Sequence, residues 1–316
     1  MHQLLAALRA AGESTRLRIL AALRNGELTV SELTRVLDQS QPRVSRHLKL
    51  LCDSGLLERY QEGAWVFHRI TDKEGISKIA RHLVSMIDIN DPALERDRKK
   101  LEEIRQEKTR VAEAYFSQHA DEWDSIRARM VSDTDIENRL INLVRTSKIK
   151  VLLDLGTGTG RILEILAPYI SKGIGFDLSK EMLGVARSKL ENAGVIHCTV
   201  RHSDIHDINM SDGCADAITI HQVLHYCDHP EQVIKEASRL LKPGGQLLLV
   251  DFLPHDLEFL REMHAHQRLG FASSTIEHWC KRYGLNTVKH EVLEAKADSR
   301  NPDTLTVGLW NASKSH

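Results

Sequence analysis

The amino-acid sequence predicts two domains of different fold class, a small α+β domain followed by a larger α/β domain. At 316 residues the chain is too long for most single compact domains. Residues 1–90 alternate short helical patterns with one pair of strand-like segments, whereas strands and helices alternate regularly from about residue 113 to 316. Residues 91–112 are dense in charge with few apolar positions, which indicates a solvated connecting helix.

The overall composition is that of a globular protein, and its charge is locally uneven. Hydrophobic residues make up 41% and charged residues 28% of the chain, and the formal net charge is −1. Residues 1–90 nevertheless carry 13 Lys and Arg against 10 Asp and Glu, and residues 40–49 contain three basic residues and no acid. Because local charge rather than net charge meets a phosphate backbone, this segment is compatible with nucleic-acid binding.

Several features point to the cytoplasm. The five cysteines are scattered without C-x-x-C spacing, which indicates reduced thiols. The first residues acquire charge too early for a signal peptide. No apolar run approaches the roughly 20 residues that a membrane span requires. We therefore expect a soluble cytoplasmic protein that does not engage a membrane.

The first domain is predicted to contain three helices near its start, and the second and third follow each other closely. Residues 14–24 predict a helix with one apolar stripe. Residues 30–37 predict a second helix, capped by Thr29 or Ser31, and residues 41–55 predict a third after a tight turn. Two short helices joined in this way, the second rich in Arg, Ser and Gln at its start, are typical of a helix-turn-helix motif.

The second helix of this motif has the size and surface to enter a major groove of DNA. Val44, Leu48 and Leu51 form its buried face, which leaves the polar side chains outward. A motif that contacts protein is the alternative, but a basic face without acids favours double-stranded DNA. The predicted DNA-binding residues are Gln41, Arg43, Ser45, Arg46 and Lys49, with Arg59 from the following strand.

Residues 56–70 read as a hairpin that turns at Glu62-Gly63, the wing of a winged helix-turn-helix domain. The helix predicted at 76–87 and the LLAAL segment near the N-terminus are more apolar than so small a domain can bury. Both indicate a homodimer in which two recognition helices address two half-sites.

Residues 29–57, TVSELTRVLDQSQPRVSRHLKLLCDSGLL, closely resemble the ArsR family of winged-helix repressors. The resemblance implies a homodimeric transcriptional regulator. It does not imply metal sensing, because metal-responsive members carry a thiolate pair where this chain has Ser31-Glu32-Leu33, and His82 stands alone in the last helix. We therefore predict no metal site.

In the second domain an apolar strand at 151–155 runs into a glycine-rich turn that precedes a helix. Glycine is expected there so that a ligand can approach the backbone N–H groups at the helix start. Dinucleotide-binding proteins use a similar turn, but they need a small residue where this chain has Arg161. Asp154 before the turn repels a pyrophosphate and suits an ammonium group, and Asp177 ends the next strand in position to bind a ribose diol.

Three further segments follow in order: an acid after a third strand at 202–205, a fourth strand with its exit loop at 215–226, and a Pro-Gly-Gly turn between a helix and a fifth strand at 240–250. Together these motifs resemble the class I methyltransferases over about residues 113–312. The resemblance implies a Rossmann-like, seven-stranded, mostly parallel sheet with helices on both faces. Residues 305–310 are the expected final antiparallel strand.

The same resemblance implies that S-adenosylmethionine (SAM) or S-adenosylhomocysteine (SAH) is bound. Met182 fits a plain core position as well as an adenine contact, and Phe116 fits packing against the sheet. His221 and His225 are weak candidates for a general base, since histidine is common in this loop without that role. The implied cofactor residues are Asp154, Gly156 and Gly158 at the methionine moiety, Gly160 in the same turn, Asp177 at the ribose, Leu178 and Met182 beside the adenine, Asp204 and Ile205 at the adenine edge, His221 at the methionine end, and Tyr115 and Trp123 on a helix that covers the cofactor.

Two functions remain open for the whole chain. His221-Gln222-Val223-Leu224 stands where enzymes that methylate DNA amino groups carry an Asn/Asp-Pro-Pro-Tyr motif, and no cluster of thiols for arsenite is evident. Methyltransferase-fused ArsR-type regulators, which the chain resembles, are associated with methionine-cycle genes. We expect a transcriptional regulator that senses SAM and SAH; the alternative is an active methyltransferase of a small-molecule acceptor with a DNA-binding regulatory domain.

Overall fold

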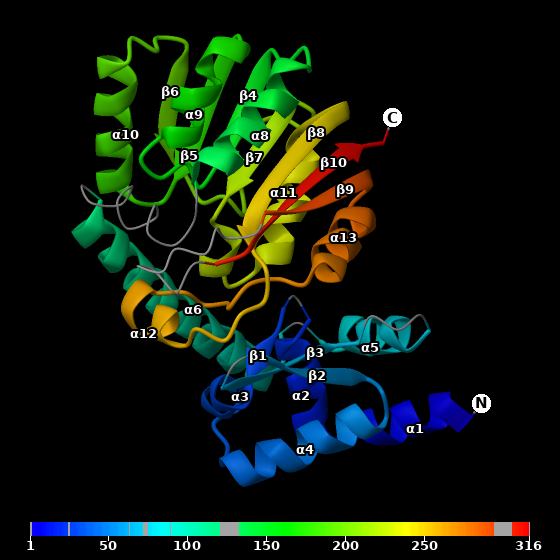
Figure 1. Ribbon diagram of the computed structural model, residues 1–316. Helices are drawn as coiled ribbons and strands as arrows, with labels where there is room; N and C mark the ends of the chain where they lie inside the picture. Colours follow the sequence, from blue (N-terminus) through cyan, green and yellow to red (C-terminus); the bar gives the residue numbers. More distant parts are fainter. Residues whose placement is uncertain are drawn as a thin grey trace. The chain divides into compact units, whose positions relative to one another are not determined.

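The computed structural model divides the chain into two compact units, unit 1 at residues 1–110 and unit 2 at residues 111–316. Figure 1 colours the chain from blue at the start of unit 1 to red at the end of unit 2. No helix in the described part of the chain is both long enough and apolar enough to span a membrane. The residues that the structure describes are 2–24, 26–62, 64–71, 75–88, 90–120, 133–293 and 305–315.

Unit 1 has the predicted winged-helix arrangement. Strand β3 pairs antiparallel with both β1 and β2, and Trp65 lies opposite Glu62, so the predicted hairpin is confirmed. The elements are α1 (His2–Ala11), α2 (Ser14–Ala22), β1 (Leu28–Thr29), α3 (Val30–Leu37), α4 (Gln41–Asp53), β2 (Leu57–Glu62), β3 (Trp65–Ile70), α5 (Ile76–Ser85) and the first part of α6 (Pro92–His119).

Local sequence explains the motif formed by α3 and α4. Thr29 accepts a hydrogen bond from the Glu32 N–H while the Glu32 carboxylate accepts from the Thr29 N–H, a capping box that starts α3. Asp38 ends α3 in the left-handed conformation, with φ of 56°. The side chains predicted to face inward on α4 are buried in the unit's core: Val44, Leu48 and Leu51.

Helix α6 is continuous from Pro92 to His119, so the charged segment and the segment after it form one helix. Leu101 and Ile104 are buried in the core of unit 1. The carboxylate of Asp97 accepts two hydrogen bonds of 2.6 Å from the Arg18 guanidinium. The first turns of α6 are thereby attached to the winged-helix unit by both apolar packing and a bidentate ion pair.

Unit 2 is built on one seven-stranded sheet with the order β6-β5-β4-β7-β8-β10-β9. Neighbouring strands from β6 to β8 are parallel, and β10 is antiparallel to β8 and β9, which confirms the predicted mostly parallel sheet and its antiparallel last strand. The elements are α8 (Asp133–Arg145), β4 (Val151–Leu155), α9 (Arg161–Leu166), η1 (Ala167–Tyr169), β5 (Lys172–Asp177), α10 (Lys180–Asn192), β6 (Cys198–His202), β7 (Ala215–His221), η2 (Leu224–Tyr226), α11 (Pro230–Leu240), β8 (Leu241–Phe252), α12 (Phe259–His264), α13 (Ser273–Arg282), β9 (Leu285–Leu293) and β10 (Val307–Lys314).

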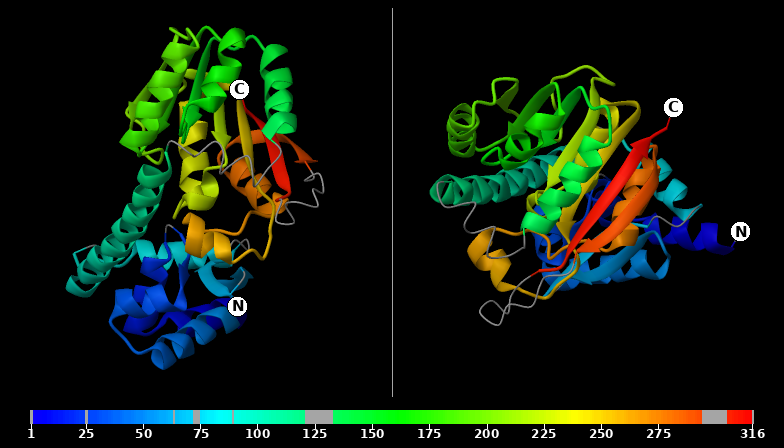
Figure 2. Two further views of the ribbon diagram at one scale, coloured as in Figure 1. Left: turned by 60° about the vertical axis from the view of Figure 1, so that its left-hand side comes forward. Right: turned by 45° about the horizontal axis from the view of Figure 1, so that its top comes forward.

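Helices cover both faces of this sheet (Figure 2). Alternate residues of β4 enter different cores: Leu152 packs with α8, α9 and α10, whereas Leu153 and Leu155 pack with α11 and α13. Because both faces are buried, the central strands β4 and β7 are largely apolar. Asp177 and His221 stand at the carboxyl ends of β5 and β7, the edge at which ligands bind in open α/β sheets.

The predicted Pro-Gly-Gly turn lies inside the bounds of β8. The pairing with β7 passes from Ala215 opposite Leu241 to Ala217 opposite Gln246, so residues 242–245 project as a bulge. Gly244 there has φ of 75°, a conformation that favours glycine.

Candidate cofactor site and nucleic-acid interface

Helix α4 presents one polar face, and the structure leaves every predicted DNA-binding side chain exposed. Burial is the main factor that lowers the pKa of His47 on the same helix; the Glu13 carboxylate opposes this, and the charges of Arg16, Arg43 and Arg46 add to it. Because residues 41–49 carry three exposed basic side chains of Lys and Arg and no acid, this face of α4 is positive, as phosphate binding requires. The exposed residues are Gln41, Arg43, Ser45, Arg46 and Lys49 on α4, and Arg59 on β2.

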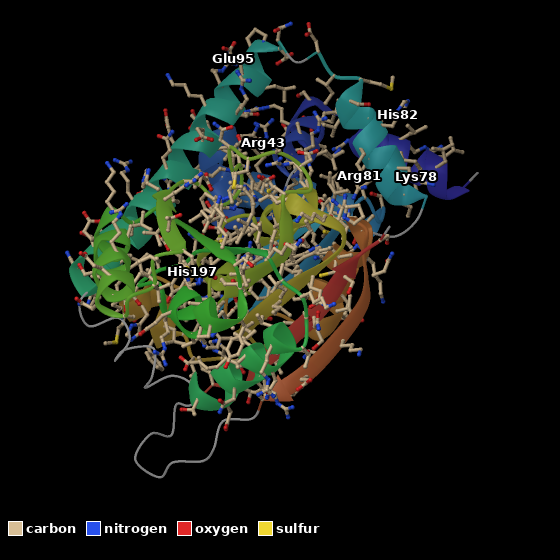
Figure 3. All side chains as sticks on the ribbon, turned by 90° about the horizontal axis from the view of Figure 1, so that it is seen from above. Arg43, Lys78, Arg81, His82, Glu95 and His197 are labelled. Carbon is tan, nitrogen blue, oxygen red and sulfur yellow. The ribbon has the colours of Figure 1, made fainter. Side chains whose placement is uncertain are left out.

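Two positions in unit 1, His82 and Glu32, bear on the question of metal binding. His82 is exposed on α5, together with Lys78 and Arg81 of the same helix (Figure 3). Glu32, on the first helix of the motif, is used in the capping box. Within the ranges that the structure describes, no group of three or more His, Cys, Asp or Glu side chains is arranged to hold a metal ion.

The glycine-rich turn joins β4 to α9 at the carboxyl edge of the sheet. Gly156, Gly158 and Gly160 have φ of 76°, 51° and 78°, which side chains rarely tolerate. A Cβ atom on Gly156 would lie 2.4 Å from a methyl group of Val223. The turn therefore needs glycine both for its backbone conformation and for the close approach of the loop after β7.

Three backbone N–H groups of this turn, ahead of the start of α9, bond within the protein. The N–H groups of Gly156 and Thr157 both donate to the Phe176 carbonyl, at 2.8 and 2.9 Å. The Gly158 N–H donates to Asp177 Oδ2 at 2.8 Å. These three donors are engaged within the protein, and the one from Gly158 positions the Asp177 carboxylate.

Asp177 ends β5 with a carboxylate whose orientation is set by backbone groups. Oδ2 accepts from the Gly158 N–H at 2.8 Å, and Oδ1 accepts from the Ser179 N–H at 2.9 Å. The side chain is partly exposed, and each carboxylate oxygen has a further lone pair. Burial raises the pKa of Asp177, and the backbone hydrogen bonds oppose that rise. This arrangement can accept hydrogen bonds from two adjacent hydroxyl groups.

Asp154 and Arg161 flank the turn. Asp154 is buried in β4, where its Oδ1 accepts from the Thr219 hydroxyl of β7 at 2.6 Å. Arg161 makes a bidentate pair with Glu137 of α8, at 2.8 and 2.7 Å. The large residue that distinguishes this turn from a dinucleotide-binding one therefore ties α9 to α8.

On the adenine side, the predicted residues have different degrees of exposure. Asp204 is exposed after β6 and accepts from the N–H and the Nδ1 of His206, and the hydrogen bond to the imidazole lowers the pKa of Asp204. Ile205 is a core residue and Leu178 is half-buried. Met182 is buried in a small cluster with Ala120, Tyr115, Phe116, Val185 and Tyr226. Trp123 lies outside the described residues.

The end of β7 contains a residue that the sequence did not single out. Next to the buried His221, Gln222 is 4% exposed and has φ of 55°. Its backbone N–H donates to the Val250 carbonyl at 2.8 Å. Its side-chain Nε2 is buried without a hydrogen bond to any residue that the structure describes.

His225, one of the two weak catalytic candidates, forms a buried pair with Asp251 at the end of β8. The His225 Nδ1 lies 2.7 Å from Asp251 Oδ1, and Asp251 also accepts from the N–H groups of Leu224 and Phe252. A carboxylate held in this way fixes the ring orientation and favours the tautomer with the proton on Nδ1.

Other aromatic and imidazole rings surround this pair. The ring centroids of Tyr226 and His266 lie 4.1 and 4.3 Å from that of His225. Burial lowers the pKa of His266 well below its ordinary value and that of His255 to about 4. The Tyr115 hydroxyl, on the last turns of α6, is 2.5 Å from His264 Nδ1.

The residues at this edge fit a nucleoside that carries an amino-acid tail. Asp177 offers acceptors for a ribose diol at the end of β5, and the Gln222 amide, buried without a partner in the described part of the chain, lies two strands away at the end of β7. Cys198 and Cys227 are buried, and burial raises the pKa of both thiols. These two cysteines therefore do not present reactive thiolates at the site.

Comparison with protein families identifies both parts of the chain. Residues 13–59 match the model of the bacterial regulatory protein arsR family, and residues 153–249 match the methyltransferase domain model. The chain thus combines an ArsR-type helix-turn-helix domain at its N-terminus with a methyltransferase domain at its C-terminus.

Individual relatives agree with this division. The chain is 50% identical over 60 residues to the arsenical resistance operon repressor of Escherichia coli. This match covers 19% of the chain and 51% of the repressor. It is 26% identical over 164 residues to an uncharacterized methyltransferase, YcgJ, of Bacillus subtilis. That match covers 48% of the chain and 63% of YcgJ. The matches thus span less than two thirds of either relative.

A solved structure shows the same fold for unit 2. It is a chain from the complex of the Trm112 methyltransferase activator with a methyltransferase of Haloferax volcanii. The TM-score is 0.55 at 18% identity, over 65% of this chain and 98% of that one.

Proposed function

We propose that the protein is a cytoplasmic, homodimeric transcriptional regulator whose methyltransferase domain binds SAM or SAH as an effector and thereby controls genes of the methionine cycle. The observation that carries the proposal is helix α6. Its first part is anchored in unit 1 by the Arg18–Asp97 pair, and its last turns carry Tyr115, which bonds to His264 in unit 2. One helix thus contains structural residues of both the DNA-binding and the effector-binding unit.

DNA binding rests on the exposed basic face of α4. Arg43 and Arg46 can each contact a base edge or a phosphate, and Lys49 and Arg59 add positive charge. Dimerisation is supported by α1, where Leu4, Leu5 and Leu8 are 45%, 46% and 43% exposed. Three exposed leucines on one short helix favour burial against a second copy.

The effector role follows from the chemistry of the two ligands. SAM and SAH differ by one methyl group and one positive charge. A protein that binds them unequally shifts its DNA-binding equilibrium by the difference in binding free energy between its two states.

Fluorescence anisotropy tests this function directly. The intact protein is titrated onto labelled DNA from upstream of its own gene, without ligand, with SAM and with SAH. A change of DNA affinity with one ligand and a smaller change with the other supports the sensor. Equal DNA affinity in all three titrations, although both ligands bind in calorimetry, refutes it.

A second function is favoured by one observation, the buried His225–Asp251 pair. Methyl transfer requires chiefly that the acceptor be aligned with the methyl donor, and SAM supplies an electrophilic methyl group when bound. A histidine oriented by a carboxylate is suited to take a proton from a hydroxyl or thiol acceptor. Transfer of label from methyl-labelled SAM to a small molecule in cell extract, lost in His225→Ala, would establish this activity.

A further inference from the structure

Gln222 occupies a conformation that its own packing does not explain. Its φ of 55° lies in the left-handed region, which is unfavourable for a residue with a Cβ atom. Its side chain is buried, yet Nε2 makes no hydrogen bond to the described residues. A buried amide donor without an acceptor destabilises the folded chain, because the group loses its hydrogen bonds to water. Strain combined with an unsatisfied polar group is typical of a residue that serves a ligand.

The position of Gln222 in the sheet indicates which ligand group it meets. Its neighbour Val223 packs against Gly156, so Gln222 lies beside the glycine-rich turn. The strand order places β4 between β5 and β7. With the ribose held by Asp177 at the end of β5, the ligand continues across the end of β4 toward β7. Its methionine half therefore reaches the side on which Gln222 lies.

Chemistry then selects one group of that half. The Gln222 Nε2 is a donor, and the α-ammonium group is also a donor. A sulfonium has no acceptor site, and a thioether sulfur is a weak acceptor. The α-carboxylate is the remaining strong acceptor, and a hydrogen bond to a charged acceptor is stronger than one to a neutral group.

Thr157 gives a useful contrast. Its hydroxyl is also buried without a partner among the described residues, but it packs over Gly175, where a Cβ atom would lie 2.5 Å from Oγ1. The Thr157 hydroxyl faces the neighbouring strand β5, and the backbone of Thr157 is not in the left-handed region. Thr157 therefore has a packing role, whereas Gln222 has none that the structure shows.

We propose that the Gln222 side-chain amide binds the α-carboxylate of the methionine half of SAM or SAH. The inference rests on the proposed binding of these ligands and adds the residue that recognises their amino-acid end. It makes Gln222 a specificity residue that separates amino-acid-bearing nucleosides from plain nucleosides.

Calorimetry on the intact protein tests the proposal with three probes: SAH, decarboxylated SAH and adenosine. Gln222→Leu has a similar size and no donor, and we expect it to weaken SAH binding about ten- to hundredfold, as for one hydrogen bond to a charged group. Binding of decarboxylated SAH and adenosine should change less than twofold. Gln222→Glu, which places a negative charge near the carboxylate, should weaken SAH binding further while decarboxylated SAH still binds.

Thermal unfolding without ligand separates this role from a structural one. Because Leu removes an unsatisfied buried donor, Gln222→Leu should unfold at the same temperature as the wild type or higher. A lower unfolding temperature together with equal losses for all three probes would show a structural residue and overturn the proposal. Unchanged SAH affinity in Gln222→Leu overturns this proposal alone, whereas a wild-type protein that binds neither SAM nor SAH overturns the proposed function with it.

Discussion

Replacing Asp177 with alanine gives the most direct test of the nucleoside site. The carboxylate oxygens accept from Gly158 and Ser179, and their remaining lone pairs are available to two ribose hydroxyls. Hydrogen bonds to a charged group contribute about 1.5–3 kcal/mol. The two hydroxyls together contribute less than twice this value, because the carboxylate must also be desolvated when the ligand covers it. A loss of about 1.5–3 kcal/mol corresponds to SAH binding that is about tenfold to about a hundredfold weaker.

The same substitution also affects the fold, and the assay must separate the two effects. Alanine leaves the Gly158 and Ser179 N–H groups without their acceptor, which costs about 1–3 kcal/mol for a donor that becomes buried and unpaired. Ser179→Ala is the matched control, because it removes the hydroxyl that caps α10 through the Met182 N–H but keeps the backbone N–H that bonds to Asp177. Calorimetry with SAH below the unfolding temperature of each variant gives the affinities. Equal SAH affinity for Asp177→Ala and the wild type would refute the assignment of the ribose site.

Four further predictions concern pH, DNA, assembly and coupling. Because protonation removes an acceptor, SAH affinity should be constant above the raised pKa of Asp177 and should fall as the pH drops through it; Asp177→Asn should abolish this dependence in calorimetry. Arg46→Ala should weaken operator binding by about 1–3 kcal/mol if the side chain reads a base, or should reduce the salt slope by about one if it contacts phosphate, as anisotropy at several salt concentrations distinguishes. Leu8→Glu should shift the protein toward the monomer in sedimentation, since a charge would be placed in the proposed interface; an unchanged dimer would locate the interface elsewhere. Arg18→Met should abolish the response of DNA affinity to SAH while SAH binding persists, because the substitution breaks the bidentate pair with Asp97; a full response in this variant would exclude that pair from the coupling.

The sequence predicted those parts of the structure that depend on local pattern. The buried face of α4 follows from apolar periodicity, although the helix ends at Asp53, two residues before the predicted end, and Asp177 stands out because an acid ends a buried strand. The glycines of the turn were identified from the sequence, whereas the partners of the Gly156, Thr157 and Gly158 N–H groups have no local sequence signal. Those partners are set by how β5 packs beside β4, which is a tertiary property.

Other features escaped for definite physical reasons. A positive φ at Gln222 has no sequence signal, since neither glycine nor asparagine occupies the position. The pairing of His225 with Asp251 joins residues 26 positions apart, on the two sides of the β7–β8 crossover. The continuity of α6 was detectable, because residues 93–119 contain neither proline nor glycine, yet its drop in charge after residue 112 was interpreted as a domain boundary.

That continuity bears on how a ligand signal can reach DNA. Residues on the first turns of α6 are held in unit 1 by Asp97 and by buried Leu101 and Ile104, and Tyr115 on the last turns is held by His264. A continuous helix with residues in both units is a candidate route for the proposed coupling, and the Arg18→Met variant tests it. The size of the response is limited by the ligands, not by the helix. If the DNA-binding state prefers SAH over SAM tenfold relative to the other state, exchange of the ligands changes the equilibrium by about 1.4 kcal/mol and no more. A larger measured response would therefore require a second ligand-dependent interaction, of which a change in dimer affinity through α1 is the one that the exposed leucines support.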